Sequence, residues 1–141
     1  MLYILEGCDG VGKTTLANRL APLLNAEVIH CTAETPNDFD FFHEIIMVAA
    51  SKNIIADRFC YGQFVYQEPT KRPLTETELR KLETEMLWVG AKLIYVTSDT
   101  PTVVDRLIYR GEKTSIPVDE IKKRFSTVLS ESILTPLVWK T

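Results

Sequence analysis

Short apolar runs alternate with longer stretches of helical periodicity along the whole chain. The runs have the length of single strands, and the stretches between them carry apolar residues three or four positions apart, as amphipathic helices do. The predicted strands cover residues 2–5, 27–30, 53–57 and 92–97, and residues 137–139 could form a fifth. The predicted helices cover residues 13–24, about 38–50, 60–67, 75–89, 100–110 and 117–132. This order predicts an α/β fold with a parallel sheet of four to five strands and helices on both faces.

Local signals mark several helix ends. Asn37 or Asp38 can cap the second helix, and residues 75–78 read Thr-Glu-Thr-Glu, which fits a capping box. Pro101 suits a first helical turn and Gly111 suits a helix end, so together they delimit the fifth helix.

The apolar faces of the helices are expected to pack into the core. On the first helix this face consists of Leu16, Leu20, Leu23 and Leu24. On the second helix it consists of Phe41, Phe42, Ile45, Ile46 and Ala49. Such faces, including Leu82, Met86 and Val89 on a later helix, could serve a homodimer interface as readily as a core.

The composition describes one mildly acidic domain. The chain has 141 residues, of which 45% are hydrophobic, enough for one core but not comfortably for two, so we predict a single domain over residues 1–141. The formal net charge of −3 gives the surface as a whole no attraction for polyanions. We therefore expect a protein that acts on small molecules and do not expect a nucleic-acid partner, because any such binding would have to be local.

The three cysteines, Cys8, Cys31 and Cys60, are odd in number and lie far apart. This pattern fits neither a disulfide framework nor paired zinc ligands, and it is typical of reduced thiols in a cytoplasm. No apolar run approaches the roughly 20 residues that span a bilayer. The first residues lack the positive region of a signal peptide, so we expect a cytoplasmic protein without a membrane partner.

A glycine-rich segment, EGCDGVGKTT, follows the first predicted strand and opens the first predicted helix. From Gly7 onward it reads GxxxxGKT, the pattern of a loop that wraps nucleotide phosphates. Its glycines keep side chains away, so that backbone N–H groups can converge on the β-phosphate. The expected nucleotide-binding residues are Gly7, Asp9, Gly10, Val11, Gly12, Lys13, Thr14 and Thr15. The alternative is that Asp9-Gly10 is merely a turn.

This loop predicts ATP and Mg²⁺ as cofactors. Lys13 would supply positive charge to the β- and γ-phosphates, and the Thr14 hydroxyl would reach Mg²⁺. The helix that follows would direct the positive end of its dipole at the same phosphates. Such a loop also needs a carboxylate that holds the metal through water, and Asp57 ends the apolar run 53–57. Taken alone, Asp57 could equally be a turn residue at a strand end.

Three motifs in this order resemble those of thymidylate kinases. The first is the phosphate loop with an aspartate at position 9, which most such loops lack. The second is DRFCYGQFVYQ, residues 57–67, which is similar to the family's Asp-Arg-aromatic motif and its Tyr-Gln ending. The third, from Asp99 to Gly111, is similar to the segment that leads into the family's mobile lid, expected here around residues 106–124. The resemblance implies the three-layer fold of P-loop kinases.

The resemblance implies roles on the acceptor side. Asp9 would face the sugar hydroxyl of the acceptor, and Arg58 would clamp the acceptor phosphate. Phe59 and Tyr66 would line the base pocket, and Gln67 would hydrogen-bond the base. The alternatives are that Asp9 is a turn former, that Arg58 forms a surface ion pair, and that Phe59 and Tyr66 are ordinary core residues.

On the donor side the resemblance points to two arginines. Arg106 and Arg110 lie four positions apart, on one helix face, and would stack on adenine and steady the transferred phosphate. The alternative is that both are surface arginines without a function. If the resemblance holds, the catalytic residues are Lys13, Asp9, Arg58 and Arg110.

Two departures from the family affect the acceptor side. Residues 33–36 read Ala-Glu-Thr-Pro where family members usually carry Arg-Glu-Pro, so the second clamp on the acceptor phosphate is missing. Lys71 and Arg72 could partly replace it from the loop after Gln67. The chain is also shorter than its relatives. Compact forms of this kind are familiar from phage genomes, which would place the protein in the host cytoplasm.

Together these observations predict Mg·ATP-dependent phosphoryl transfer to a pyrimidine deoxynucleoside monophosphate, either dTMP or a modified dUMP. One alternative is a kinase of a deoxynucleoside, or of modified bases or ends in DNA, and the missing arginine favours it. The other is a nucleotide-binding module without catalysis. Asp9, Arg58 and Gln67 argue against such a module, because a sensor needs only the donor side.

Overall fold

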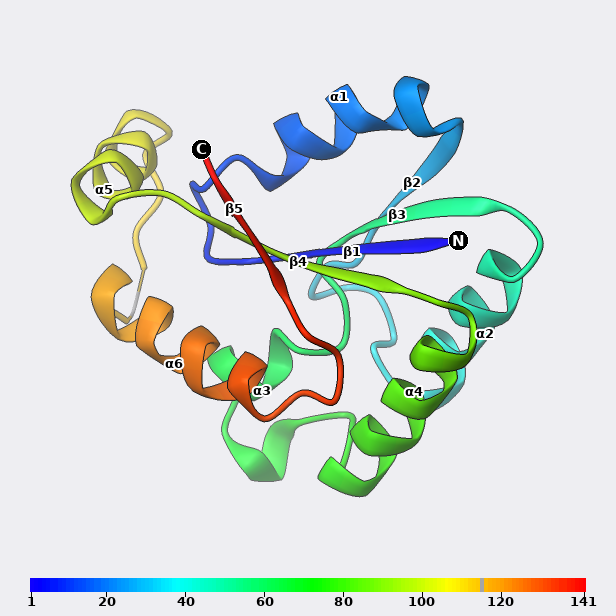
Figure 1. Cartoon of the computed structure of the whole chain (residues 1–141). Coiled ribbons are helices and arrows are strands. Elements are labelled where there is room, and N and C mark those ends of the chain that lie inside the picture. Colours follow the sequence, from blue (N-terminus) through cyan, green and yellow to red (C-terminus); the bar gives the residue numbers. More distant parts are fainter. Residues whose placement is uncertain (115) are drawn as a thin grey trace.

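The computed structural model describes residues 1–114 and 116–141, which form one parallel sheet flanked by helices (Figure 1). The strands are β1 (Leu2–Glu6), β2 (Ala26–His30), β3 (Asn53–Asp57), β4 (Lys92–Thr97) and β5 (Leu137–Lys140). The helices are α1 (Lys13–Leu24), α2 (Phe39–Ala49), α3 (Gln63–Tyr66), α4 (Glu76–Trp88), α5 (Thr100–Tyr109) and α6 (Val118–Ser130). The sheet order is β2-β3-β1-β4-β5, and every neighbouring pair is parallel. The predicted fold class is confirmed.

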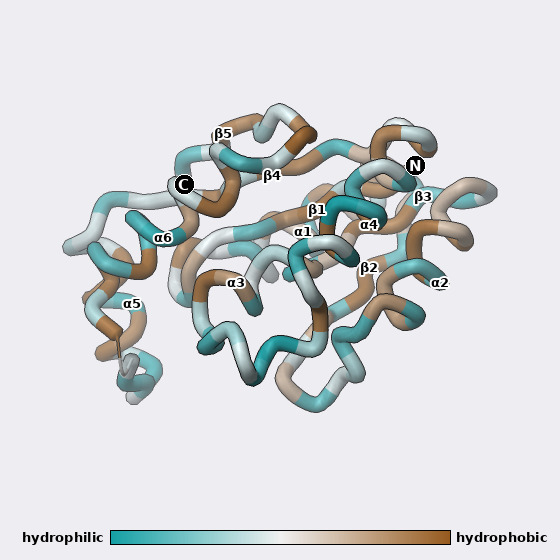
Figure 2. Tube along the Cα trace, turned by 90° about the horizontal axis from the view of Figure 1, so that it is seen from below, coloured by the Kyte–Doolittle hydropathy of each residue, from teal (hydrophilic) through white to brown (hydrophobic). Residues whose placement is uncertain are grey.

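The helices form a layer on each face of the sheet. Figure 1 shows α1 on one face, with α2, α4 and α6 on the other. The inner strands β1 and β3 are buried on both sides, and their covered residues are Leu2, Ile4, Leu5, Ile54, Ile55 and Ala56. Figure 2 shows hydrophobic residues along the inner strands and alternating hydrophobic and hydrophilic stretches along the helices. The core therefore lies along the central strands, between the two helical layers.

The carboxyl ends of the strands share one edge of the sheet, and the residues that follow them meet there. β1 pairs with β3 in a register that sets Leu5 beside Asp57. The glycine-rich loop follows β1 at this edge, and α5 lies beyond the same end of the sheet (Figure 1). In open α/β sheets this edge is where ligands bind.

Several predicted helix ends are confirmed. Asp38, not Asn37, caps α2, since its side chain accepts a hydrogen bond from the Phe41 N–H at 3.0 Å. Thr75 and Glu78 form the predicted capping box at the start of α4. At the end of α5, Gly111 has a positive φ of 69°, which suits the stop that its glycine predicts.

Two predictions about the helices are wrong. The predicted helix over residues 60–67 contains only Gln63–Tyr66. In the residues before it, the backbone N–H of Tyr61 donates to the carboxylate of Glu6 at 2.9 Å. Leu23 does not face the core but is 80% exposed near the end of α1, whereas Phe41 packs against the core as predicted, although it is only half-buried.

The apolar faces of α2 and α4 pack on the core. Phe42 and Ile45 on α2 and Leu82 and Met86 on α4 are buried in the single chain. The predicted lid around 106–124 spans the end of α5 and the start of α6, and Ser115 within it lies outside the described residues. Among the described helices, none combines the length and the apolar character that a membrane crossing requires.

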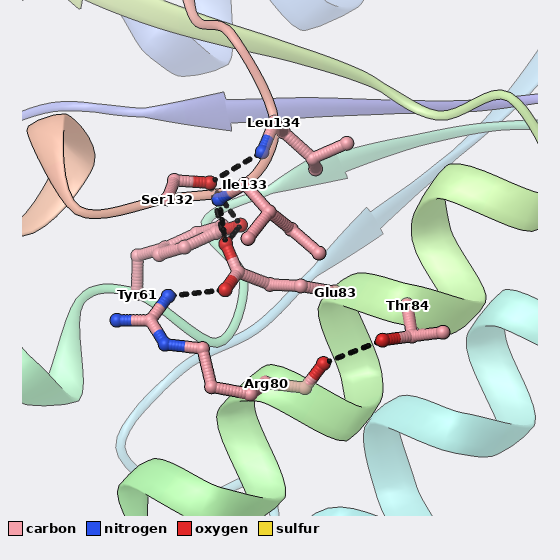
Figure 3. Close-up of polar contacts among 7 residues, drawn as sticks. All are labelled: Tyr61, Arg80, Glu83, Thr84, Ser132, Ile133 and Leu134. Carbon is pink, nitrogen blue, oxygen red and sulfur yellow. Dashed lines mark hydrogen bonds and ion pairs between the residues drawn. The ribbon is translucent and has the colours of Figure 1, made fainter.

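A buried carboxylate on α4 ties three segments together (Figure 3). Glu83 is fully buried and accepts hydrogen bonds from the Tyr61 hydroxyl at 2.8 Å, the Ser132 hydroxyl at 2.5 Å and the Ile133 N–H at 3.2 Å. Its other oxygen pairs with Arg80, one turn earlier on α4. Because a buried carboxylate is costly without such partners, this cluster fixes Tyr61 and with it the segment that follows β3.

Candidate functional site

The glycines of the loop between β1 and α1 are required by its backbone. Gly7, Gly10 and Gly12 have φ values of 153°, 86° and 93°, which side-chain-bearing residues rarely adopt. At Gly7 a Cβ atom would also collide with the carbonyl oxygen of Val96 on β4. The loop is thus pressed against the neighbouring strand, and its N–H groups are left uncovered by side chains.

Lys13 is folded back over this loop. Its ammonium group donates to the carbonyl oxygens of Gly7 at 2.6 Å and Cys8 at 2.9 Å, and its side chain is buried. Burial lowers the pKa of Lys13, while the nearby carboxylates of Asp57 and Glu6 act in the opposite direction. A cation held this way stands inside the loop, at the N-terminus of α1, where a phosphate would bind.

Oxygen ligands converge beside the loop. The Thr14 hydroxyl donates to Asp57 Oδ2 at 2.7 Å, and His30 Nδ1 lies 3.0 Å from the same oxygen. The pairing of β2 with β3 sets His30 directly beside Asp57. Across the described residues, no group of three or more histidine, cysteine or acidic side chains could hold a metal ion by itself.

Arg58 and Asp9 form an ion pair across the loop. Arg58 has a positive φ of 69°, which is uncommon for a residue with a side chain, and its N–H donates to Leu5 O at 3.0 Å. Such a backbone conformation costs on the order of 1–3 kcal/mol and is often found at functional sites. It directs the guanidinium toward the loop that precedes α1.

Three cavities surround the loop. We name the largest, of about 1100 Å³, the outer cavity; it is lined by α1, α5 and β5, including Arg106 and Trp139. The loop cavity, of about 370 Å³, is lined by Lys13, Thr14, Asp57, Asp9 and Arg58, among others. The inner cavity, of about 180 Å³, is lined by Glu6, Arg58, Phe59 and Tyr66, among others. Arg58 lines both the loop cavity and the inner cavity, so it stands at their common wall.

Three aromatic side chains, Phe59, Tyr66 and Phe125, line part of the inner cavity. Phe59 is only 4% exposed and packs edge-on against Phe42 of α2, with ring centroids 4.7 Å apart. Tyr66 packs edge-on against Phe125 of α6 at 5.9 Å. The hydroxyl of Tyr66 is buried and has no hydrogen-bond partner within residues 1–114 and 116–141.

The other predicted acceptor residues lie farther out. Gln67 also lines the inner cavity but is exposed. Arg72 lies outside this cavity, donates to the carbonyl oxygens of Gln67 at 2.9 Å and Phe64 at 3.3 Å, and stacks over the Phe64 ring at 4.9 Å. The structure therefore brings Asp9, Arg58, Phe59 and Tyr66 together around the loop, while Arg72 is engaged elsewhere.

The two predicted lid arginines lie near the loop, Arg106 on α5 and Arg110 as the residue that caps its end. Arg106 Nη1 donates to the carbonyl oxygen of Gly10 at 3.0 Å. Arg110 lines both the outer cavity and the loop cavity, and its guanidinium lies 3.5 Å from the carboxylate of Glu112. Both positively charged groups are thus near the loop, although each also contacts a partner in the chain.

Glu6, to which the sequence interpretation gave no role, lies in the wall of the inner cavity. It is only 1% exposed, and burial raises its pKa to about 7, although Lys13 and Arg58 act in the opposite direction. One signal was available, because Glu6 ends an apolar strand at the carboxyl edge of the sheet, as Asp57 does. His30 was also missed, because its position beside Asp57 depends on strand register.

Comparison with known proteins places this fold. No protein-family model and no curated protein matches the chain. The YorR protein from Bacillus subtilis, in complex with phosphorylated GDP, has a TM-score of 0.85 and 29% identity, covering 99% of this chain and 85% of that one. A deoxyadenosine kinase from M. mycoides with bound dCTP has a TM-score of 0.63 and 16% identity, covering 99% of this chain and 90% of that one.

Polyphosphate kinase 2 from Arthrobacter aurescens TC1 has a TM-score of 0.68 and 16% identity, covering 99% of this chain and 60% of that one. The likenesses at 16% identity show the fold, which is that of P-loop kinases. They do not single out thymidylate kinases, so the closer resemblance inferred from the sequence motifs stays a prediction.

Proposed function

We propose that this chain transfers the γ-phosphoryl group of Mg·ATP to a pyrimidine deoxynucleotide, with dTMP or a modified dUMP as the first acceptors to test. The observation that carries the proposal is the wall at Arg58. There a phosphate-binding loop with its buried lysine adjoins an aromatic cavity of about 180 Å³. A donor on the loop and an acceptor in the inner cavity would meet across this guanidinium.

Charge neutralisation supports the donor side of this proposal. Phosphoryl transfer asks the protein mainly to position the two substrates and to stabilise negative charge on the transferred group. Lys13, Arg58 and Arg110 all line the loop cavity and would supply that charge. The phosphorylated GDP bound to the YorR protein is consistent with a nucleotide at such a loop.

The residues beside the loop fit Mg²⁺. This ion prefers oxygen ligands and keeps several bound waters, so one hydroxyl and one carboxylate are suitable ligands for the protein to supply. Thr14 would bind it directly and Asp57 through water, from hydroxyl and carboxylate oxygens that lie 2.7 Å apart. When bound, the ion would neutralise charge on the phosphates and help align them.

The inner cavity supports a base-containing acceptor. Phe59 and Tyr66 both line this cavity and contribute apolar ring surface to its wall. Gln67 stands at its exposed edge and could reach a base edge with its amide. Asp9, from the other side of the Arg58 wall, would bind a sugar hydroxyl.

A deoxynucleoside acceptor is the second candidate, and the charge of the inner cavity favours it. Among the described residues that line this cavity, Arg58 is the one cation, and it already pairs with Asp9. A monophosphate acceptor would bring about two negative charges into this space. A DNA acceptor is not favoured, because the net charge of −3 offers polyanions no general attraction.

ADP release over a panel of acceptors tests the proposal. The panel contains dTMP, dUMP, 5-hydroxymethyl-dUMP, dCMP, thymidine and single-stranded DNA, and the acceptor that stimulates release identifies the substrate class. Lys13→Ala should lower the rate by at least about 100-fold, because it removes a charge aimed at the reacting phosphates. Circular dichroism should show its fold intact.

Two results would count against the proposal. Full transfer by Lys13→Ala would remove the loop from the mechanism. Tight ATP binding without product from any acceptor would support the alternative of a nucleotide-binding module without catalysis.

A further inference from the structure

We propose that Glu6 is the general base of the transfer reaction, which selects the second candidate acceptor, a deoxynucleoside that reacts through a hydroxyl group, in place of the monophosphate named first. This inference rests on the proposed phosphoryl transfer and chooses between its two acceptor classes. A phosphate acceptor is already ionised near neutral pH and needs no base. A hydroxyl must lose its proton as it attacks. A carboxylate in the inner cavity can therefore act as a base only for a hydroxyl acceptor.

Glu6 lies where the two proposed substrates would meet. It is the last residue of β1 and directly precedes Gly7, the first glycine of the phosphate loop. Its side chain is 1% exposed and forms part of the inner cavity beside Arg58 and Phe59. Glu6 lines the inner cavity only, and its neighbour Arg58 lines both this cavity and the loop cavity.

The carboxylate is held in place by the backbone of the segment after β3. Oε2 accepts the Tyr61 N–H at 2.9 Å, and Tyr61 is itself fixed through its hydroxyl by the buried Glu83 (Figure 3). The other oxygen, Oε1, lies 3.9 Å from the position that a Cβ on Gly62 would take. A hydrogen bond from the backbone of Phe59 also acts on this carboxylate and lowers its pKa, against the effect of burial.

The surroundings tune the proton affinity of this group. Burial is the largest influence and raises the pKa of Glu6 to about 7, against Lys13 and Arg58. The titratable groups that face Glu6 are Lys13 on α1, Arg58, Cys60 and Tyr66 after β3, and Cys31 after β2. A base whose pKa lies near the working pH can both take and release a proton, which is the condition for efficient catalysis.

The inner cavity is already supplied with negative charge. Glu6 contributes one carboxylate to the wall of this cavity. Arg58 is the one cation among the described residues that line the cavity, and it is paired with the Asp9 carboxylate. A monophosphate would add about two charges that this arrangement does not neutralise. An uncharged acceptor adds none, so the electrostatics and the buried base favour the same class of acceptor.

The reaction step balances without a further reactant. The Glu6 carboxylate takes the proton of the acceptor hydroxyl, whose oxygen forms a bond to the γ-phosphorus. The bond from that phosphorus to the oxygen bridging the β- and γ-phosphates breaks, and ADP leaves with the electron pair. The proton passes from Glu6 to solvent afterwards, which restores the carboxylate.

The test measures kcat/KM with ATP for the four deoxynucleosides and their four 5′-monophosphates, between pH 5.5 and 9. We expect phosphorylation of a deoxynucleoside, with kcat/KM falling about tenfold per pH unit below about pH 7. Glu6→Gln should lower kcat/KM by roughly 100-fold or more and should abolish this acidic limb. If the fall in kcat/KM at low pH came from protonation of ATP, it would persist in Glu6→Gln. This variant therefore distinguishes titration of ATP from titration of Glu6.

Glu83→Gln is the matched control. Glu83 is the other buried carboxylate that contacts Tyr61, and the substitution removes its charge. Glu83 does not line the inner cavity. The pH midpoint of this variant should equal that of the unchanged chain, whatever its stability. ATP binding by calorimetry shows that both variants are folded.

Each remaining outcome decides the matter. If only monophosphates are phosphorylated, the proposed transfer stands and the role of Glu6 as base is wrong. If a deoxynucleoside is phosphorylated and Glu6→Gln keeps both rate and limb, Glu6 is a structural residue. If no acceptor is phosphorylated, the proposed function fails, and this inference fails with it.

Discussion

At the scale of single residues, position 6 shows a carboxylate kept where it weakens the fold. The pKa of Glu6 is raised from 4.5 to about 7 by burial. The folded chain therefore holds the proton more tightly than the unfolded chain does. Stability from this group is fully present below about pH 4.5 and is lost as the pH rises toward and through 7.

This shift leads to a prediction about stability. Glutamine resembles the protonated form of Glu6, so Glu6→Gln should raise the free energy of unfolding at pH 8 by about 3 kcal/mol. Most of that gain should disappear at pH 5, where the native carboxyl is protonated. Urea unfolding at the two pH values measures the difference. An equal effect at both would show that Glu6 is not strained by its charge.

The residue scale also shows what the sequence could and could not predict about the site. The loop residues Gly7 to Thr15 are contiguous, so their pattern reveals them without a structure. Asp9 and Arg58 were assigned through resemblance, and they do lie together. Glu6 acquires its character from burial under the segment after β3, and Arg72 is directed away by local carbonyl oxygens. Neither effect is visible in a local pattern.

At the scale of elements, most helices and strands follow from local signals. α1 and β3 begin and end where periodicity and flanking residues predict. The exception is the segment 60–67, in which the helix is limited to Gln63–Tyr66. The hydrogen bond between Tyr61 and Glu6, 55 positions apart, belongs to a tertiary context that periodicity cannot reveal.

The capping box of α4 gives the prediction at this scale. Thr75 Oγ1 accepts the Glu78 N–H at 3.1 Å, and the Glu78 carboxylate accepts the Thr75 N–H at 2.9 Å. Thr75→Ala should therefore lower the free energy of unfolding by about 1 kcal/mol. Thr75→Ser keeps the hydroxyl and should change it little. Thermal unfolding of the two variants measures the difference, and equal losses would refute the cap.

At the scale of the whole molecule, the sheet order creates the site. With β1 between β3 and β4, the loop after β1 meets the residues that end β3 at one edge of the sheet. β5 and α5 close the far side and line the outer cavity. No single motif contains this arrangement, although the alternation of strands and helices predicted the sheet that allows it.

The outer cavity gives a prediction for the whole molecule, because the chain has two tryptophans in different surroundings. Trp139 lines this cavity, whereas Trp88 is 87% exposed at the end of α4. If the base of ATP binds there, ATP should change the fluorescence of Trp88→Phe, which keeps Trp139. It should leave the fluorescence of Trp139→Phe unchanged. A signal only in Trp139→Phe would place the nucleotide elsewhere.

The wall that Arg58 forms between two cavities implies cooperation between the substrates. Without ligands, its guanidinium is neutralised by Asp9. If both proposed substrates draw on this arginine, the first to bind would have to break the pair with Asp9, and the second would not pay that cost again. Each would then increase the affinity for the other by the same factor. The Arg58–Asp9 pair would in this way disfavour binding of either substrate without the other.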